Sequence, residues 1–130
     1  MAAAPGAAYR GAMPGLRILL VDDHREFRAS ATALLTVEGF RVVASAASGE
    51  EALAVIDELE LDLVLLDLYL PGLDGVEVAQ LLAQREQPPP VILISSQVDA
   101  ATEPRVAAAP VRGFLAKADL ACASIRRLLG

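Results

Sequence analysis

Five short apolar segments alternate with amphipathic segments along this chain, and this alternation limits the folds that it can adopt. The apolar segments are Leu16–Val21, Phe40–Ala44, Asp62–Leu66, Val91–Ile94 and Val111–Leu115. Short apolar runs bounded by turn residues are typical of buried strands. The third segment is apolar at successive positions, which predicts a central strand covered by helices on both faces.

Helical periodicity fills the intervals between these strands. In Glu26–Glu38 one face carries four apolar residues, namely Phe27, Ala31, Leu34 and Leu35. Ser48 followed by Glu51 matches a capping box that opens a second helix. The later helices are predicted over Val76–Arg85, Ala100–Ala109 and Asp119–Leu129. The Ala100–Ala109 pattern is weaker, since Pro104 either lies in its first turn or breaks it.

Five strands that alternate with five helices predict an α/β fold, a doubly wound parallel sheet with helices on both faces. In such sheets the functional residues gather at the carboxyl ends of the strands. The 130 residues make about one domain. Residues 1–15 are rich in Ala, Gly and Pro and are predicted to be a flexible leader. Residues 16–130 are predicted to be the folded domain.

Composition excludes several classes of protein. The net charge of −6 argues against direct binding of nucleic acid, whose phosphates an acidic surface repels. The single cysteine, Cys122, excludes an internal disulfide and a cysteine-based zinc site, and it is expected to pack at the core boundary. No apolar run approaches the ~20 residues of a membrane span. A cytoplasmic protein is therefore expected.

Polar side chains follow four of the five predicted strands. Asp22 and Asp23 follow the first strand, Asp67 follows the third, Ser95 follows the fourth, and Lys117, the only lysine, follows the fifth. Each of these residues alone could be a helix cap, a turn residue or a solvated side chain. Together they suit phosphoryl transfer.

The chemistry of these side chains explains why they indicate phosphoryl transfer. Three nearby carboxylates repel one another and favour a hard cation such as Mg²⁺, which prefers oxygen ligands. An Asp carboxylate can act as a nucleophile and form an acyl phosphate. A lysine ammonium is a compact charge suited to one phosphoryl oxygen, whereas arginine presents a wider fork.

In this set the chain resembles the receiver domain of bacterial two-component response regulators, and within it the NarL/LuxR-like class. The resemblance covers about residues 16–129, and four segments carry it in order: Ile18–Asp23, Asp67–Gly75, Val91–Ser95 and Gly113–Lys117. It implies a flavodoxin-like fold with strand order 2-1-3-4-5. It also implies a switch rather than an enzyme, apart from self-catalysed phosphorylation and dephosphorylation.

The resemblance further implies a role for each site residue. Asp67 would accept the phosphoryl group, and Asp22, Asp23, Asp67 and the backbone carbonyl of Tyr69 would hold Mg²⁺ or Mn²⁺. Lys117 and Ser95 would bind phosphoryl oxygens. Ser95 and Phe114 would form the conformational switch. Tyr69 and Gln97 occupy positions that tune the lifetime of the phosphoryl group.

The chain departs from the family pattern near the implied switch face. Ala118 replaces the usual proline after the lysine, which predicts a trans peptide bond there. Pro104 and Pro110 also lie in this region and put its mobility and partner surface in question. His24 follows the acidic pair, and we expect a solvated loop residue rather than a ligand, because Mg²⁺ prefers oxygen.

The implied partners are a sensor histidine kinase or phosphotransfer protein, and a second copy of the chain after phosphorylation. Receivers of this class commonly precede a helix-turn-helix output domain that controls transcription. A receiver-like interaction module that works without phosphorylation is the main alternative. An Asp-nucleophile phosphatase is disfavoured because Tyr69 stands where such enzymes carry a second Asp. A flavin or dinucleotide site is disfavoured because no G-x-G-x-x-G follows the first strand.

Overall fold

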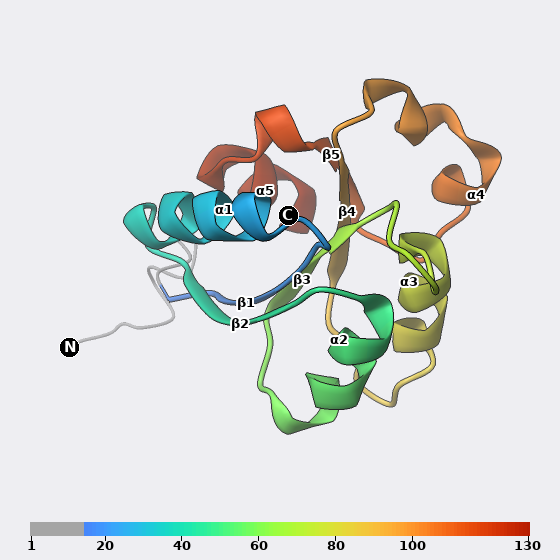
Figure 1. Cartoon of the computed structure of the whole chain (residues 1–130), viewed down its shortest axis with the longest axis horizontal. Coiled ribbons are helices and arrows are strands. Elements are labelled where there is room, and N and C mark those ends of the chain that lie inside the picture. The colour runs from blue at the N-terminus through green and yellow to red at the C-terminus, as the bar shows by residue number, and fades with distance from the viewer. Residues whose placement is uncertain (1–14) are drawn as a thin grey trace.

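A computed structural model describes residues 15–130 of the chain. The predicted leader therefore lies, up to residue 14, outside the described residues. The strands are β1 (Arg17–Val21), β2 (Arg41–Ala46), β3 (Leu63–Asp67), β4 (Val91–Ser95) and β5 (Gly113–Ala116). They form one parallel sheet in the order β2-β1-β3-β4-β5, as Figure 1 shows. The predicted doubly wound α/β fold with strand order 2-1-3-4-5 is confirmed.

Helices cover both faces of this sheet. The α-helices are α1 (Arg25–Val37), α2 (Gly49–Val55), α3 (Gly75–Ala83), α4 (Pro104–Ala107) and α5 (Cys122–Leu129). Short 3-10 helices are η2 (Ile56–Glu58), η3 (Val98–Thr102) and η4 (Lys117–Asp119). Helices α1 and α5 lie on one face of the sheet, and α2, α3 and α4 lie on the other (Figure 1).

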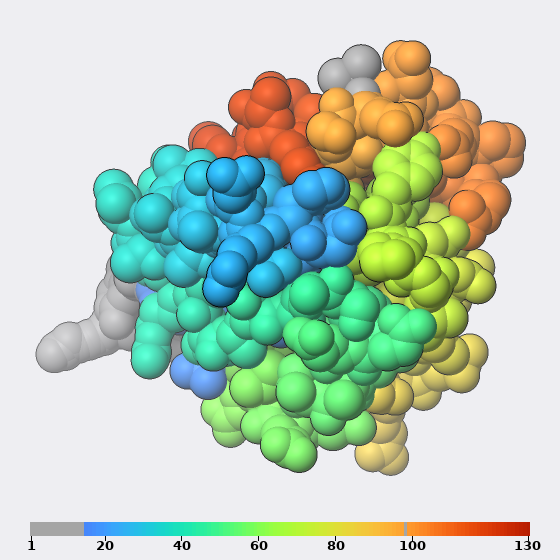
Figure 2. All heavy atoms as spheres, in the orientation of Figure 1, coloured from blue at the N-terminus to red at the C-terminus, as the bar shows by residue number. Residues whose placement is uncertain are grey.

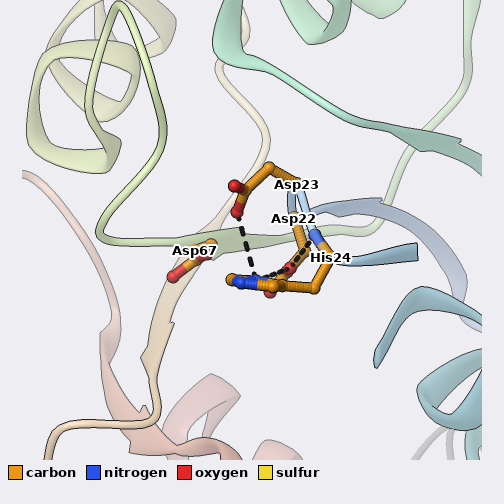
Figure 3. Close-up of side chains that lie close together, drawn as sticks. All are labelled: Asp22, Asp23, His24 and Asp67. Atoms are coloured by element: carbon orange, nitrogen blue, oxygen red, sulfur yellow. Dashed lines mark hydrogen bonds and ion pairs between the residues drawn. The ribbon is translucent and has the colours of Figure 1, made fainter. Parts of the chain in front are cut away.

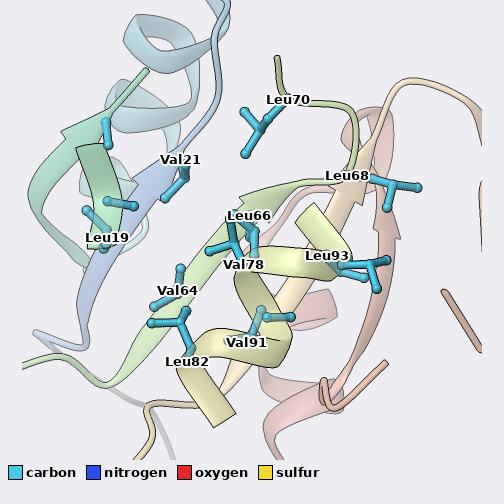
Figure 4. Packing of buried hydrophobic residues seen from close by; sticks show 14 of the residues in the cluster. Leu19, Val21, Val64, Leu66, Leu68, Leu70, Val78, Leu82, Val91 and Leu93 are labelled. Atoms are coloured by element: carbon cyan, nitrogen blue, oxygen red, sulfur yellow. The ribbon is translucent and has the colours of Figure 1, made fainter. Parts of the chain in front are cut away.

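The strands divide their side chains between two apolar layers. In β1, Leu19 and Val21 pack with α2 and α3, whereas Ile18 and Leu20 pack with α1 and α5. Figure 4 shows the first of these layers, with side chains of β1, β3 and β4 against α3. All residues of β3 are buried, as the two-sided apolar pattern predicted. Burial on both faces fixes β3 at the centre of the molecule, and with it the carboxylate at its end.

Three predictions about the helices were wrong in detail. The helix predicted over Ala100–Ala109 is instead η3 followed by the four-residue α4, because Pro104 lacks an amide proton and starts a new helix. The last helix begins at Cys122 rather than at Asp119, since Leu120 has an extended backbone. Leu34 is 40% exposed because only Ala31 and Leu35 of the predicted face of α1 point fully into the core.

The capping box predicted at Ser48, at the start of α2, forms only in part. The Ser48 side chain accepts a hydrogen bond from the Glu51 amide, but the Glu51 carboxylate accepts from the Ala47 amide rather than from Ser48. A complete capping box occurs instead at α3, between Asp74 and Glu77. The Lys117–Ala118 peptide bond is trans, as expected.

Candidate functional site

Strand register brings the predicted site residues to one edge of the sheet. Val21 pairs with Leu66, so Asp22 and Asp67, the next residues, lie side by side. Asp67 in turn pairs with Ile94, which places Ser95 beside it. Ser95 pairs with Ala116, the residue before Lys117. In the space-filling view of Figure 2, segments that follow different strands converge at this edge of the molecule.

Lys117 lies between two buried carboxylates. Its Nζ atom is 2.5 Å from Oδ2 of Asp22 and 3.6 Å from Oδ2 of Asp67. The side chain of Asp22 is fully buried, and Asp67 is only 3% exposed. The lysine therefore balances part of the negative charge at the end of the two central strands.

The charge of Asp67 is nevertheless only partly compensated. Burial and the neighbouring Asp22 carboxylate together raise the pKa of Asp67 to about 6, against the opposing effect of Lys117. The amide of Tyr69 donates a hydrogen bond of 3.3 Å to Oδ1 of Asp67 and also favours the ionised form. A raised carboxylate pKa beside a second carboxylate indicates a pocket that attracts a further cation.

Asp23 and His24 complete an acidic cluster around this pocket. One possible ligand atom from each of Asp22, Asp23, His24 and Asp67 lies within 4.8 Å of the others. Figure 3 shows the His24 ring beside the carboxylates of Asp22 and Asp23. The oxygen donors of the three aspartates suit a hard divalent ion, so the residues present fit Mg²⁺ or Mn²⁺.

The residues after β3 and β4 connect the pocket to the region of α4. The Tyr69 hydroxyl donates a 2.5 Å hydrogen bond to Oε1 of Glu103, the residue before α4, and this contact raises the pKa of Tyr69. Ser95 is buried, and its hydroxyl accepts a 3.0 Å hydrogen bond from the Gln97 amide. Tyr69 and Gln97 are both exposed, at the rim of the pocket.

Phe114 lies on β5, next to a hollow in the protein surface. It is partly buried against the apolar layer of α2, α3 and α4. Together with Val106 and Gly113 it lines a hollow of ≈ 200 Å³ beside α4. The ring therefore has unfilled space next to it, on the side of the sheet that carries α4.

Several residues that hold the site in place could not be identified from the sequence. The Phe27 ring lies under Lys117, with Nζ 4.4 Å from the ring centroid. The Arg28 guanidinium donates a 2.6 Å hydrogen bond to the backbone carbonyl of Asp22. Only tertiary packing joins these helix α1 side chains to β1 and η4, and their spacing in the sequence carries no sign of it.

Gly75, the first residue of α3, was also missed. A Cβ atom at this position would lie 2.5 Å from the backbone oxygen of Asp67 and 2.8 Å from Cα of Leu68. Its amide donates a 2.8 Å hydrogen bond to the Leu68 carbonyl. Glycine thus lets the start of α3 approach the backbone of the buried carboxylate. The Asp-Gly pair at 74–75 is a turn signal, but nothing in the sequence indicates this close approach.

The fold and the site together define a doubly wound domain with an acidic pocket and a partly buried lysine at the carboxyl ends of its strands. Residues 18–123 match the family model of the response regulator receiver domain. The chain belongs to this family and is a receiver domain of the two-component type.

Relatives of known function support this assignment. The chain is 44% identical to the positive alginate biosynthesis regulatory protein of Pseudomonas aeruginosa over 68% of its own length and 36% of the relative. It is 41% identical to the transcriptional regulatory protein AfsQ1 of Streptomyces coelicolor over 67% of this chain and 37% of that protein. The chain thus spans well under half the length of these curated relatives.

Solved structures agree in fold. The signal receiver domain of the putative response regulator NarL from Mycobacterium tuberculosis has a TM-score of 0.76 and 32% identity, covering 89% of this chain and 94% of that one. The response regulator TrrA from Thermotoga maritima, solved in complex with Mg²⁺-BeF, has a TM-score of 0.75 and 29% identity, covering 87% and 98%.

The helices described in residues 15–130 are all too short or too polar to cross a membrane.

Proposed function

We propose that this receiver domain is a phosphorylation switch whose phosphoacceptor is Asp67. The proposal rests mainly on one observation: the buried Asp67 carboxylate lies beside a second buried carboxylate and 3.6 Å from the ammonium of Lys117. An oxygen of Asp67 would attack the phosphorus of a phosphohistidine donor, the phosphorus–nitrogen bond would break, and an acyl phosphate would form. The donor would be a sensor histidine kinase or a phosphotransfer protein.

A divalent ion would be needed for this transfer. Asp22, Asp23 and Asp67, with the backbone carbonyl of Tyr69, would hold Mg²⁺ or Mn²⁺, which would neutralise the charge on the incoming phosphoryl oxygens. The description of the relative TrrA with Mg²⁺-BeF supports this assignment. Lys117 would bind one phosphoryl oxygen after exchanging part of its contact with Asp22.

The response to phosphorylation would pass through Ser95 and Phe114. Phosphorylation adds about −1.5 to −2 charges and new hydrogen-bond acceptors beside Asp67. The Ser95 hydroxyl, which now accepts from Gln97, would turn to donate to a phosphoryl oxygen. Phe114 would then move in the space beside α4. Tyr69 and Gln97, at the rim, would set how easily water reaches the acyl phosphate.

The wider protein would be a regulator in a two-component pathway. Residues 16–130 would form the receiver unit, and the longer relatives support an output domain that controls transcription. Two copies of the receiver would associate after phosphorylation.

Phosphorylation with a small donor tests the proposal. The chain is incubated with Mg²⁺ and acetyl phosphate and its intact mass is measured. We expect a gain of one phosphoryl group that is stable in acid and labile in base. Asp67→Asn should remove this gain, whereas Asp57→Asn, an exposed aspartate before β3, should keep it. No gain with acetyl phosphate or with a cognate kinase would leave the interaction module as the better account.

A further inference from the structure

His24 lies within the acidic cluster and reaches two of its members at once. Its Nδ1 atom is 3.2 Å from Oδ1 of Asp22 and 3.2 Å from Oδ1 of Asp23. The side chain is 69% exposed, so the ring is open to solvent and to an arriving ion. It is the only histidine of the chain. The preference of Mg²⁺ for oxygen disfavours His24 as a magnesium ligand, but it does not disfavour ligation of ions that accept nitrogen.

The distances match the arrangement of ligands around one metal ion. In an octahedral site with bonds of about 2.1 Å, neighbouring ligand atoms are about 3 Å apart and opposite ones about 4.2 Å apart. The imidazole nitrogen stands at the neighbouring distance from both carboxylate oxygens. The spread of the whole cluster, 4.8 Å, is close to the opposite distance. Four side chains are therefore near the positions that a single ion requires.

The charges around the ring nitrogen also favour a cation. If Nδ1 carries a proton, that proton can point fully at only one of the two carboxylate oxygens. If Nδ1 carries a lone pair, the lone pair faces two anionic oxygens. In the form with the lone pair, a divalent ion between the three atoms would replace this repulsion with three attractive contacts.

Lys117 and His24 do not compete for the same carboxylate oxygen. It contacts Oδ2 of Asp22, whereas His24 contacts Oδ1, so the two cationic or basic groups address different oxygens of the same carboxylate. The backbone amide of His24 also donates a 2.7 Å hydrogen bond to Oδ1 of Asp22, which holds the residue next to the pocket.

We propose that His24 is a ligand of the divalent ion and shifts the selectivity of the site from Mg²⁺ towards ions that accept imidazole, such as Mn²⁺ and Co²⁺. This inference shares the metal site of the proposed function but does not depend on phosphorylation of Asp67. Imidazole nitrogen binds the first-row transition ions more strongly than it binds Mg²⁺, and its preference increases from Mn²⁺ to Co²⁺. The site would then be a mixed centre of oxygen ligands and one nitrogen ligand.

Metal affinities measured by calorimetry on the untagged chain test the selectivity. His24→Phe keeps a ring of similar size without a ligand atom. We expect it to weaken Co²⁺ and Mn²⁺ binding by about tenfold or more while Mg²⁺ binding changes by less than about twofold. Arg25→Lys, which keeps the charge of an exposed neighbour, is the matched control and should alter none of the affinities. An equal change for all three ions, or no change, would overturn the proposal.

Pulsed electron paramagnetic resonance of the Mn²⁺-loaded chain tests ligation directly. Because the chain has one histidine, coupling to an imidazole ¹⁴N nucleus can come only from His24. The coupling should be present in the unchanged chain and absent from His24→Phe. Absence of coupling in the unchanged chain refutes ligation by His24. A chain that shows the coupling but takes no phosphoryl group would refute the proposed function alone.

Discussion

The Asp67 side chain is costly to the metal-free protein, because the fold holds an aspartate with a pKa of about 6 in place of the usual 3.8. Burial is the largest cause of this shift, and Asp22 adds to it. A carboxyl whose pKa is higher in the folded state than in the unfolded state destabilises the fold as pH rises through that interval.

Asp67→Asn should therefore stabilise the metal-free protein. The expected gain in free energy of unfolding is roughly 1–3 kcal/mol at pH 7, from a shift of about two pKa units. The sign follows from proton binding: between pH 4 and 6 the folded state holds the proton that the unfolded state loses, so the advantage of the variant grows with pH and is constant above about pH 6.

Urea unfolding in EDTA at pH 5 and pH 7 measures this difference. The exposed Asp57→Asn serves as control, since Asp57 forms only a surface ion pair with Arg85 and the loss of such a pair should change stability little. Equal stability of Asp67→Asn and the unchanged chain at both pH values would contradict the argument.

The space around the Lys117 side chain fits a single ammonium group. Its side chain is 13% exposed and is enclosed by Asp22, Asp67 and the ring of Phe27. Lys117→Arg should keep a positive charge but place a wider guanidinium group where a single point charge fits. We expect the affinity for beryllofluoride, a phosphoryl mimic, to fall by about tenfold, equivalent to about 1.4 kcal/mol.

Nuclear magnetic resonance shifts at Ser95 and Phe114 during beryllofluoride titration give that affinity. The exposed Arg25→Lys is the reverse exchange and should leave the titration unchanged. Near-normal binding and shifts in Lys117→Arg would show that the rarity of lysine in this chain carries no functional meaning.

Helix α3 begins at a capped aspartate that also ties it to α4. The Asp74 carboxylate accepts a 2.9 Å hydrogen bond from the Glu77 amide and a 2.6 Å hydrogen bond from the Arg105 guanidinium. Partial burial opposes ionisation, but these two contacts outweigh it and hold the pKa of Asp74 below its usual value. The Asp74–Arg105 ion pair and the Tyr69–Glu103 contact are two links between the acceptor loop and the α4 region.

Substitutions at Asp74 separate the cap from the ion pair. Asp74→Ala removes both and should lower the free energy of unfolding by about 1 kcal/mol. Asp74→Asn keeps a capping oxygen and should lose only a few tenths of that amount, because surface ion pairs stabilise little. Chemical denaturation of both variants provides the comparison. A loss in Asp74→Asn as large as in Asp74→Ala would assign the stability to the charge.

The molecule as a whole should be more stable with a divalent ion, since the ion binds the folded acidic cluster and not the unfolded chain. At a free Mg²⁺ concentration one hundred times its dissociation constant, the expected gain is about 2.7 kcal/mol. Thermal unfolding across a Mg²⁺ series should show a melting temperature that rises with concentration and returns to its starting value with EDTA.

Variants test whether the rise in melting temperature comes from metal binding at the acidic cluster. Asp67→Asn, which loses one carboxylate ligand, should show a smaller rise than the unchanged chain, whereas Asp57→Asn should show the same rise. A melting temperature that does not respond to millimolar Mg²⁺ in the unchanged chain would contradict the assignment of a metal site to this cluster.

Local patterns were enough to predict the sheet, the buried central strand and the residues at the strand ends. Strands such as Leu63–Asp67 have a strong apolar pattern, and a parallel sheet brings their carboxyl ends to one edge whatever the loops do. The positions of Asp22, Asp67, Ser95 and Lys117 follow from this rule. The weaker apolar pattern over Ala100–Ala109 did not predict a single helix correctly. Pro104 divides this segment into η3 and α4.

The order of the elements and the side chains that reach the edge of the sheet could be predicted from local sequence patterns. The partners of these side chains depend on the folded structure: Lys117 lies between two carboxylates, Phe27 lies beneath it, and His24 lies between Asp22 and Asp23. Hydrophobic periodicity is a local property that neighbouring residues fix. Distances and pKa values in a pocket depend on side-chain packing between segments far apart in the chain, so they emerge only after the helices close on the sheet.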